Sequence, residues 1–359
     1  MRMSSTFGKA GIVAATLGAA TLVGLAGVQA QEATVGFMSS NDQSCGPFPQ
    51  KNAAAFGFWD DLGLKVNFLS SATTVPFVAF LQNGDADVVM LDSAQVLQAA
   101  DSGLPIKVVY EAYQFAPDGI VVVEDSPIKG LDDLHDVTVG MASDRDLITT
   151  VIALASVGKT LESANIKSVV VGDSGPVMAA ALRDKTIDAF AGGSTDRAGI
   201  EAAGVKFRNI TPPEVSRNPG NSMAVWGPTI EEKRPQITAF LKGWAMAQMA
   251  GALDTKLTAA ACRTMVPEDF EHVDVGTRMI DNQVYNMQLR RTQEWGELQP
   301  DVWAAIQPPY LTQKEITKEI DPSTFLDSSF IAAANDFTTE DVKKKIYAWR
   351  DANPDKLLP

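Results

Sequence analysis

Residues 137–155, VTVGMASDRDLITTVIALA, contain the pattern that decides the fold. Residues 137–141 form a short apolar run typical of a buried strand, and Ser143 followed by Asp146 is a capping pair that begins a helix. That helix continues with apolar residues at helical spacing, namely Leu147, Ile148, Val151, Ile152 and Ala155. A strand that passes through a polar turn into a helix is the repeating element of α/β proteins.

The same design occurs twice more downstream. Residues 168–171 lead into GDSGP at 172–176, and residues 187–191 lead into GGSTD at 192–196. Ligands of open α/β sheets bind beyond the carboxyl ends of strands, where the N-termini of helices leave N–H groups unpaired and favour anions. A single turn of this kind also occurs in any α/β protein. Several such turns on two facing lobes favour a ligand-binding cleft.

Strand and helix patterns also alternate in the rest of the chain and predict a mostly parallel sheet. Gly63 and Gly84 suit the left-handed position after a helix, and Thr74 with Pro76 suits a helix start. Strands are predicted at 34–38, 65–69, 87–91, 106–113, 119–123 and 223–226. Helices are predicted at 50–62, 94–100, 231–253, 255–265, 273–290 and 339–353. The strand at 223–226 is expected to return to the first lobe.

The first 30 residues have the features of a secretory signal peptide. Arg2 and Lys9 precede an apolar run at 10–28, and Val28-Gln29-Ala30 is the small-residue pattern that signal peptidase cuts. A bare membrane anchor is the alternative, but glycines interrupt the run and a cleavage site ends it. We expect a mature protein that begins at Gln31 and is periplasmic. Its 329 residues (359 minus 30) suggest two lobes, with 31–120 plus 222–359 as lobe 1 and 121–221 as lobe 2.

Composition argues against several classes of function. The formal net charge is −14 and no Lys/Arg run long enough to neutralise phosphates is present, so nucleic acid is not expected as a partner. Cys45, Cys262, His135 and His272 are too few for a typical zinc site, so we expect no metal and no cofactor. The cysteines are either joined in a disulfide or buried as separate thiols. The histidines lie in polar segments typical of the surface.

Short motifs occur along the chain in a characteristic order. They are FGFW (56–59), GLKV (63–66), NGDADV (83–88), GLPIK (103–107), SPIKGLDDL (126–134), AAL (180–182), IDA (187–189) and FLDSSF (325–330). In this order they resemble the nitrate/sulfonate/taurine and thiamine-pyrimidine solute-binding proteins of ABC importers, the SsuA/THI5/NMT1-like family. The resemblance implies an α/β, two-lobed periplasmic-binding-protein type II fold with a hinge and an interlobe cleft.

The resemblance also implies a function. We expect a monomer, not an enzyme, that captures a small-molecule solute between its lobes and passes it unaltered to an ABC permease in the inner membrane. The solute is expected to be an organic anion, a sulfonate or an aromatic carboxylate. The loop at 41–48 matches neither a plain sulfonate binder nor the cysteine-rich motif of the pyrimidine synthases. A thiamine-pyrimidine precursor, a ligand-sensing module and an enzyme on the same fold are the alternatives.

The predicted ligand contacts lie in loops after strands and at the crossovers between the lobes. Lobe 1 contributes Ser39, Asn41, Asp42, Ser71, Thr73, Thr74, Asp92 and Ser93. Lobe 2 contributes Ser143, Asp144, Arg145, Ser174, Ser194 and Thr195. Aromatic residues Tyr113, Phe115 and Trp226 are candidates for a wall against a flat ligand, with hinge packing as their alternative role. Trp244, Trp295, Trp303 and Trp349 are predicted to be packing residues.

Arg145 has the largest consequence among these residues. A cation in the first turn of a helix opposes the helix dipole, which favours an anion in front of it. The alternative is an exposed arginine that pairs with Asp144 or Asp146.

Overall fold

The computed structural model describes residues 33–39, 43–69, 76–114, 118–212, 215, 219–289 and 292–358. Glu32–Pro359 is one compact unit, and Met1–Gln31 is a separate unit. The predicted signal peptide lies outside the described residues. Within the described ranges, no helix has the length and apolar character needed to cross a membrane.

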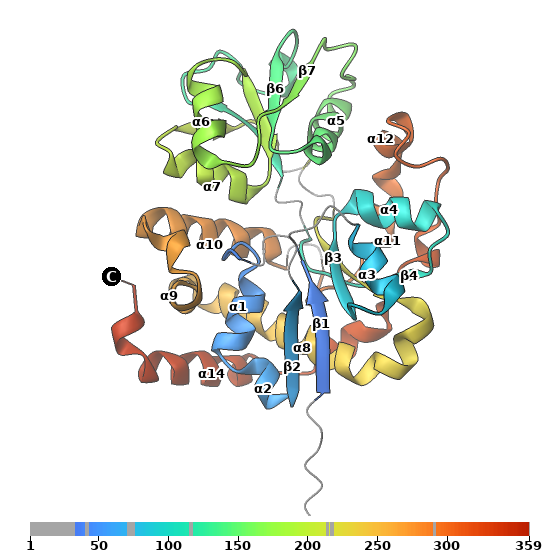
Figure 1. The fold of residues 1–359 in the computed structure, drawn as a ribbon, viewed down its shortest axis with the longest axis vertical. Helices are drawn as coiled ribbons and strands as arrows, with labels where there is room; N and C mark the ends of the chain where they lie inside the picture. The colour runs from blue at the N-terminus through green and yellow to red at the C-terminus, as the bar shows by residue number, and fades with distance from the viewer. Residues whose placement is uncertain are drawn as a thin grey trace, which may run out of the picture. The chain divides into compact units, whose positions relative to one another are not determined.

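One five-stranded sheet organises the half that we call lobe 1, with the strand order β2-β1-β3-β10-β4 (Figure 1). Its strands are β1 (Ala33–Met38), β2 (Leu64–Leu69), β3 (Val88–Leu91), β4 (Ile106–Glu111) and β10 (Ser222–Trp226). Early helices of this lobe are α1 (Phe48–Ala55), α2 (Phe58–Asp61), α3 (Phe77–Asn83) and α4 (Ser93–Asp101). Later ones are α8 (Ile230–Leu253), α9 (Thr255–Met265), α10 (Val273–Met287), α11 (Pro300–Ala305), α12 (Gln307–Thr312), α13 (Ile331–Ala334) and α14 (Thr339–Ala352).

A second five-stranded sheet organises lobe 2, with the order β7-β6-β8-β5-β9. Its strands are β5 (Gly119–Val123), β6 (Thr138–Met141), β7 (Lys167–Val170), β8 (Ala189–Gly192) and β9 (Phe207–Asn209). The helices of this lobe are the 3₁₀ turns η1 (Leu131–Asp133) and η2 (Asp144–Asp146) with α5 (Leu147–Ser156), α6 (Gly175–Arg183) and α7 (Ser194–Ala202). The residue boundaries predicted for the two lobes stay a prediction.

Both sheets are mostly parallel, as the sequence pattern predicted, and each contains one strand that runs in the opposite direction. In lobe 1, β10 runs antiparallel to β3 and β4, and in lobe 2, β5 runs antiparallel to β8 and β9. The reason is the path of the chain: β5 and β10 are the strands that follow a crossover between the lobes. Each crossover leaves the chain beside the carboxyl ends of the parallel strands. The strand that follows therefore starts at those ends and runs in the opposite direction.

The two crossover segments pair with each other between the lobes. The N–H of Tyr113 donates to the carbonyl of Asn221 at 3.1 Å, and the N–H of Gly220 donates to the carbonyl of Tyr113 at 2.9 Å. Short paired connections of this kind can absorb a change in backbone angles while each lobe stays rigid, which is the property of a hinge.

Several local expectations hold and others need correction. Gly63 and Gly84 adopt φ of +64° and +78°, as predicted for the residue after a helix. The helix predicted at 50–62 is instead two helices, α1 and α2, because Gly57 at φ +69° interrupts it. Thr74 lies outside the described residues, and the cap of α3 is Pro76. The pattern also missed β9 and the short helices α11, α12 and α13, which are too brief to show a period.

The core explains the late tryptophans and the cysteines. Trp244 and Trp303 are 0% exposed and Trp295 is 6% exposed, while Trp349 is partly buried against the cluster that contains Trp244 and Trp295. These placements confirm the predicted packing roles. Cys45 and Cys262 form a disulfide across 217 residues, with 6.0 Å between their Cα atoms. The bond fixes the loop before α1 to α9.

Candidate ligand-binding site

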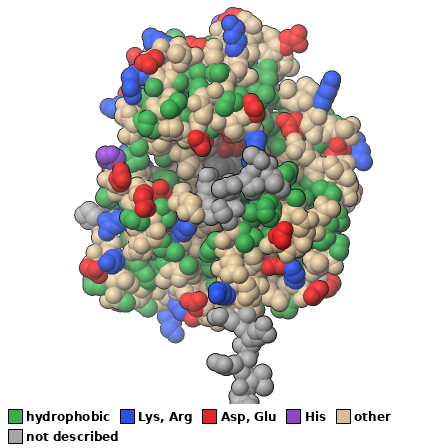
Figure 2. Space-filling model, in the orientation of Figure 1, with side chains coloured by type: hydrophobic (Ala, Val, Ile, Leu, Met, Phe, Trp, Pro, Cys, Tyr) green, Lys and Arg blue, Asp and Glu red, His purple; other side chains and the backbone are tan. Residues whose placement is uncertain are grey.

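The loops predicted to bind a ligand meet where the two lobes face each other. Ser39 and Asp92 directly follow β1 and β3 in lobe 1, and Ser143 and Ser194 stand just beyond β6 and β8 in lobe 2. Figure 2 shows a hollow between the lobes on the face in view, with acidic side chains at its border. Strands of both sheets therefore direct their carboxyl ends toward a common space, as expected for a binding cleft.

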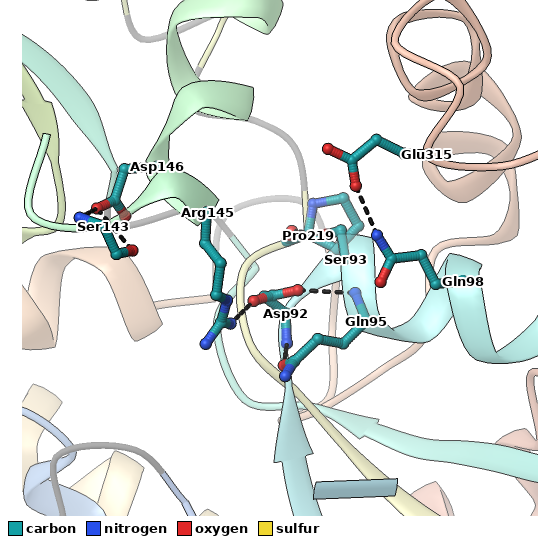
Figure 3. A network of polar contacts seen from close by, with 9 residues as sticks. All are labelled: Asp92, Ser93, Gln95, Gln98, Ser143, Arg145, Asp146, Pro219 and Glu315. Atoms are coloured by element: carbon teal, nitrogen blue, oxygen red, sulfur yellow. Dashed lines mark hydrogen bonds and ion pairs between the residues drawn. The ribbon is translucent and has the colours of Figure 1, made fainter. Parts of the chain in front are cut away.

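An ion pair between the lobes crosses this space. The guanidinium of Arg145, in η2 of lobe 2, donates to the Oδ2 atom of Asp92 in lobe 1 (Figure 3). The expected alternatives for Arg145 were a ligand anion or a neighbouring carboxylate on its own turn. Its partner is instead a carboxylate 53 residues away in sequence, which only the approach of the lobes brings into reach.

Asp92 is held in place by the start of α4. Its side chain accepts from the N–H of Gln95 at 2.8 Å, and its own N–H donates to Gln95 Oε1 at 3.1 Å, which is a reciprocal cap. The next residue, Ser93, is 6% exposed and donates to the carbonyl of Pro219 in the second crossover at 2.5 Å. The start of α4 thus touches both lobe 2 and the hinge.

Carboxylates of the first crossover and of lobe 2 surround Arg197, which is partly buried. Arg197, in the first turns of α7, donates to the carbonyl of Gly192 at 3.0 Å. Burial raises the pKa of Asp118 to about 7; Arg197 opposes this shift, and Asp146, Asp92 and Asp196 add to it. Burial also raises the pKa values of Asp146 and Asp196. The carboxylates of the site therefore repel one another. Binding of a proton or a cation, or separation of the lobes, would reduce this repulsion.

A neutral polar contact closes another part of the interface. Gln283 of α10 donates to the hydroxyl of Ser194 in α7 at 2.7 Å, and both side chains are buried. A Cβ atom at Gly46 would lie 3.6 Å from Thr195 Oγ1 and 3.8 Å from Gln283 Nε2. The loop before α1, helix α10 and the start of α7 therefore converge at one place.

Two helix pairs bring the lobes together on either side of the cleft. Helix α7 packs against α10, where Arg278 and Glu201 form an ion pair at 3.0 Å (Figure 1). Helix α5 packs against α12, and its Ile148 and Ile152 join a core cluster of lobe 1. The lobes are thus in contact in this conformation.

The other predicted contacts divide into three groups. Ser39 is buried and donates to Gln50 Oε1 at 3.4 Å, and Tyr113 is a buried part of the hinge. Asp144 and Ser174 are exposed at the starts of their helices. Trp226 lies at the opposite edge of the lobe 1 sheet, because antiparallel β10 ends beside Ile106, where β4 begins. Asn41, Asp42, Ser71, Thr73, Thr74 and Phe115 lie outside the described residues.

Sequence reasoning missed five residues of this site. Asp146 and Asp196 accept from the N–H groups of Ser143 and Gly193, so the capping pattern that identified the loops also contained them. Asp118 and Arg197 lie close in sequence to residues that were predicted, but no sequence pattern indicates that their side chains are shielded from solvent. Gln283 belongs to a helix of the other lobe and carries no local signal. Within the described ranges, no group of three or more His, Cys, Asp or Glu residues is arranged to hold a metal ion.

Two α/β lobes joined by paired crossovers define the class as the periplasmic-binding-protein type II fold, as the motif resemblance predicted. A comparison with protein families gives a match to the family described as NMT1/THI5 like over residues 51–250. This match covers more than half of the 359 residues, and the chain belongs to the NMT1/THI5-like family.

Solved structures with the same fold are distant in sequence. The periplasmic aliphatic sulphonate binding protein SsuA from Escherichia coli is 15% identical, with a TM-score of 0.64 over 82% of this chain and 92% of that one. The alkanesulfonate-binding protein SsuA from Xanthomonas axonopodis pv. citri, bound to MOPS, is 12% identical, with a TM-score of 0.63 over 83% and 99%. At such identities the likeness shows the fold alone.

An enzyme also has this fold. The desulfurization enzyme DSZB is 13% identical, with a TM-score of 0.57 over 84% of this chain and 98% of that one. A comparison with curated protein sequences gives no significant match. The two SsuA structures are described as sulfonate-binding proteins and DSZB as an enzyme, so the shared fold by itself does not separate binding from catalysis.

Proposed function

We propose that the protein is the periplasmic solute-binding protein of an ABC importer, which captures a small organic solute between its lobes and passes it unaltered to a membrane permease. The observation that carries the proposal is the pair of contacts across the cleft, Arg145 to Asp92 and Gln283 to Ser194. Side chains of both lobes meet there above a paired hinge. Contacts that form only when lobes approach shift the population toward a closed state.

The solute that we propose is an organic anion, a sulfonate or an aromatic carboxylate. Support comes from the two guanidinium groups, Arg145 and Arg197, among described residues of the site. The surrounding carboxylates oppose an anion unless one of them is protonated. Asp118, whose pKa burial raises to about 7, can take up that proton. The affinity for an anion is therefore expected to be higher at pH 6 than at pH 8. A bound anion repels the ionised form of Asp118, so it binds more tightly when Asp118 is protonated.

An enzyme on the same fold is the main competing function, since DSZB shares the architecture. General acid–base chemistry needs a side chain with a suitable pKa within reach of the substrate. His135 and His272 are exposed, as predicted for surface residues; His135 lies just after η1, and His272 precedes the first residue of α10. Asp118 has the pKa that a general base requires, so turnover must be tested directly. A ligand-sensing module or a binder of a thiamine-pyrimidine precursor would show the same closure with a different partner or solute.

A thermal-shift panel tests the proposal. The purified mature protein is mixed with sulfonates, aromatic carboxylates and pyrimidines, and one organic acid should raise the melting temperature by several degrees, because a ligand of the folded state adds stability by mass action. The bound compound should be recovered unchanged by mass spectrometry. A conversion product would favour the enzyme, and a full panel without any shift would overturn the proposal. Loss of uptake in a deletion strain distinguishes an importer from a sensor.

A further inference from the structure

Three polar side-chain atoms near the cleft are buried without a hydrogen-bond partner. Among the residues that the structure describes, Gln50 Nε2, Gln283 Oε1 and Ser222 Oγ are in this state. Gln50 and Ser222 are 0% exposed and Gln283 is 2% exposed. A buried polar group without a partner costs about 1–3 kcal/mol, so natural proteins keep few of them, and those kept need an explanation.

The position of Gln50 places its amide at the cleft edge of the lobe 1 sheet. Its Oε1 atom accepts from Ser39, the residue that directly follows β1, at 3.4 Å. Gln50 is also in the first turn of α1, whose preceding loop reaches Thr195 of lobe 2 at Gly46. The free Nε2 atom therefore belongs to a side chain that lies where β1 ends.

Gln283, on α10, lies near the same loop before α1. Its Nε2 atom donates to Ser194 at the start of α7, and a Cβ atom at Gly46 would lie 3.8 Å from that nitrogen. One amide atom of Gln283 thus holds the lobes together, while the other has no donor within the described residues. Ser222 begins β10 opposite Leu91, so it lies at the same edge of the sheet.

We propose that Gln50 and Gln283 form an uncharged hydrogen-bonding subsite that takes a hydroxyl or carboxamide group of the solute, with Ser222 beside it. This inference rests on the proposed function and adds a second recognition element to it. The solute group accepts from Gln50 Nε2 and donates to Gln283 Oε1. A sulfonate or carboxylate cannot satisfy this subsite, because neither group donates to Gln283. The solute is thus an organic anion that also carries a neutral polar group.

A series of related probes tests the subsite. Benzoate and benzenesulfonate are compared with their 3- and 4-hydroxy and 3- and 4-carbamoyl derivatives by calorimetric titration of the mature protein. At least one substituted compound should bind the wild type about tenfold or more tightly than its parent, since the parent leaves buried groups unpaired. Gln50→Met should remove this preference while the affinity for the parent stays within about threefold. Gln283→Met should also remove the preference, but it should weaken the parent as well, because it deletes the interlobe bond to Ser194.

A control variant separates recognition from stability. Gln236 of α8 also has an unpartnered amide oxygen, and α8 begins at the sheet edge away from the cleft. Gln236→Met should leave the preference for substituted probes unchanged. In the absence of any probe, Gln50→Met should unfold at nearly the same urea concentration as the wild type, because it removes the unpaired Nε2 donor but also leaves the Ser39 hydroxyl without its acceptor.

The outcomes distinguish this inference from the proposed function. Parent anions that bind the wild type without any preference for a hydroxyl or carboxamide would overturn the subsite and leave the proposed function standing. A loss of stability in Gln50→Met without any change in preference would do the same. If no probe of either series binds the wild type, the proposed capture of aromatic anions fails, and the subsite fails with it.

Discussion

Arg145 of lobe 2 donates to Asp92 of lobe 1, so the cation that was expected to face either a ligand anion or Asp144 or Asp146 pairs with a carboxylate of the other lobe (Figure 3). The side chain of Arg145 remains 62% exposed, and that of Asp92 is 30% exposed. A pair this accessible contributes little to stability but is well placed to exchange partners. An incoming anion could replace Asp92 at the guanidinium.

Asp92→Asn should strengthen the binding of an organic anion by up to about fivefold, since it frees Arg145 from a pair worth at most about 1 kcal/mol. Asparagine can still cap α4, so the helix start is preserved. The measurement is calorimetric titration with an anion that binds the wild type. Asp144→Asn, which removes an exposed charge beside Arg145, is the control. Unchanged or weaker binding in Asp92→Asn would argue against exchange at Arg145.

Arg145→Ala should weaken the same anion while the melting temperature of the unliganded protein changes by a degree or less. The reason is that an exposed ion pair contributes about 0–1 kcal/mol, whereas an anion in a cleft depends on its cation. Differential scanning calorimetry with and without the anion measures both effects. A large loss of stability without ligand would show that Arg145 has a structural role instead.

Stability should decrease as pH rises toward neutrality. Burial raises the pKa of Asp118 from 3.8 to about 7, so between these values the folded state holds a proton that the unfolded chain has lost. This contribution is complete below about pH 3.8 and is lost as pH rises through about 7. The pKa values of Asp146 and Asp196 shift in the same direction.

We therefore expect the free energy of unfolding to be larger at pH 5.5 than at pH 8, and Asp118→Asn to reduce this difference. Urea denaturation at the two pH values provides the measurement. Carboxyl groups whose pKa is lowered, such as Asp133 and Asp136, titrate below this window and do not interfere. An identical difference in wild type and variant would show that Asp118 does not titrate there.

The disulfide should stabilise the mature protein by about 2–4 kcal/mol, because it closes a long loop in the unfolded chain. Cys45→Ala combined with Cys262→Ala removes the bond that joins residues 217 apart. Urea denaturation compares the free energy of unfolding of this double variant with that of the oxidised wild-type protein. Free thiols in protein isolated from the periplasm would contradict the pairing.

A buried carboxylate should anchor the C-terminal region to the sheet. Glu111 at the end of β4 is 0% exposed and accepts from Gln299 at 2.9 and 2.7 Å and from Trp303 at 2.8 Å. Glu111→Leu should cost about 3 kcal/mol, because it leaves these donors unpaired. Glu315→Leu, at an exposed position that bonds Gln98, should cost far less by the same urea denaturation.

The fold was largely predictable because it follows from local patterns. Strand β6 is a short apolar run, and helix α9 has apolar residues at helical spacing and a capping Asp254. Such features depend only on residues close together in the sequence. Mixed pairing was not predictable in this way, since the direction of β5 and β10 depends on where the chain crosses between lobes. The loops at Asp92 and Ser194 were found by their turn residues, but Gln50 and Gln283 have no local pattern that marks burial at a cleft.

The sequence by itself determined the two-lobed α/β architecture, the loops at the carboxyl ends of the strands, and the packing roles of the tryptophans, because each depends on neighbours within a turn or a strand. Tertiary structure alone decided the partner of Arg145, the pairing of the two cysteines, and the burial of Asp118 and Gln283. Those properties depend on distances between residues far apart in the chain, and such distances exist only once the lobes have packed.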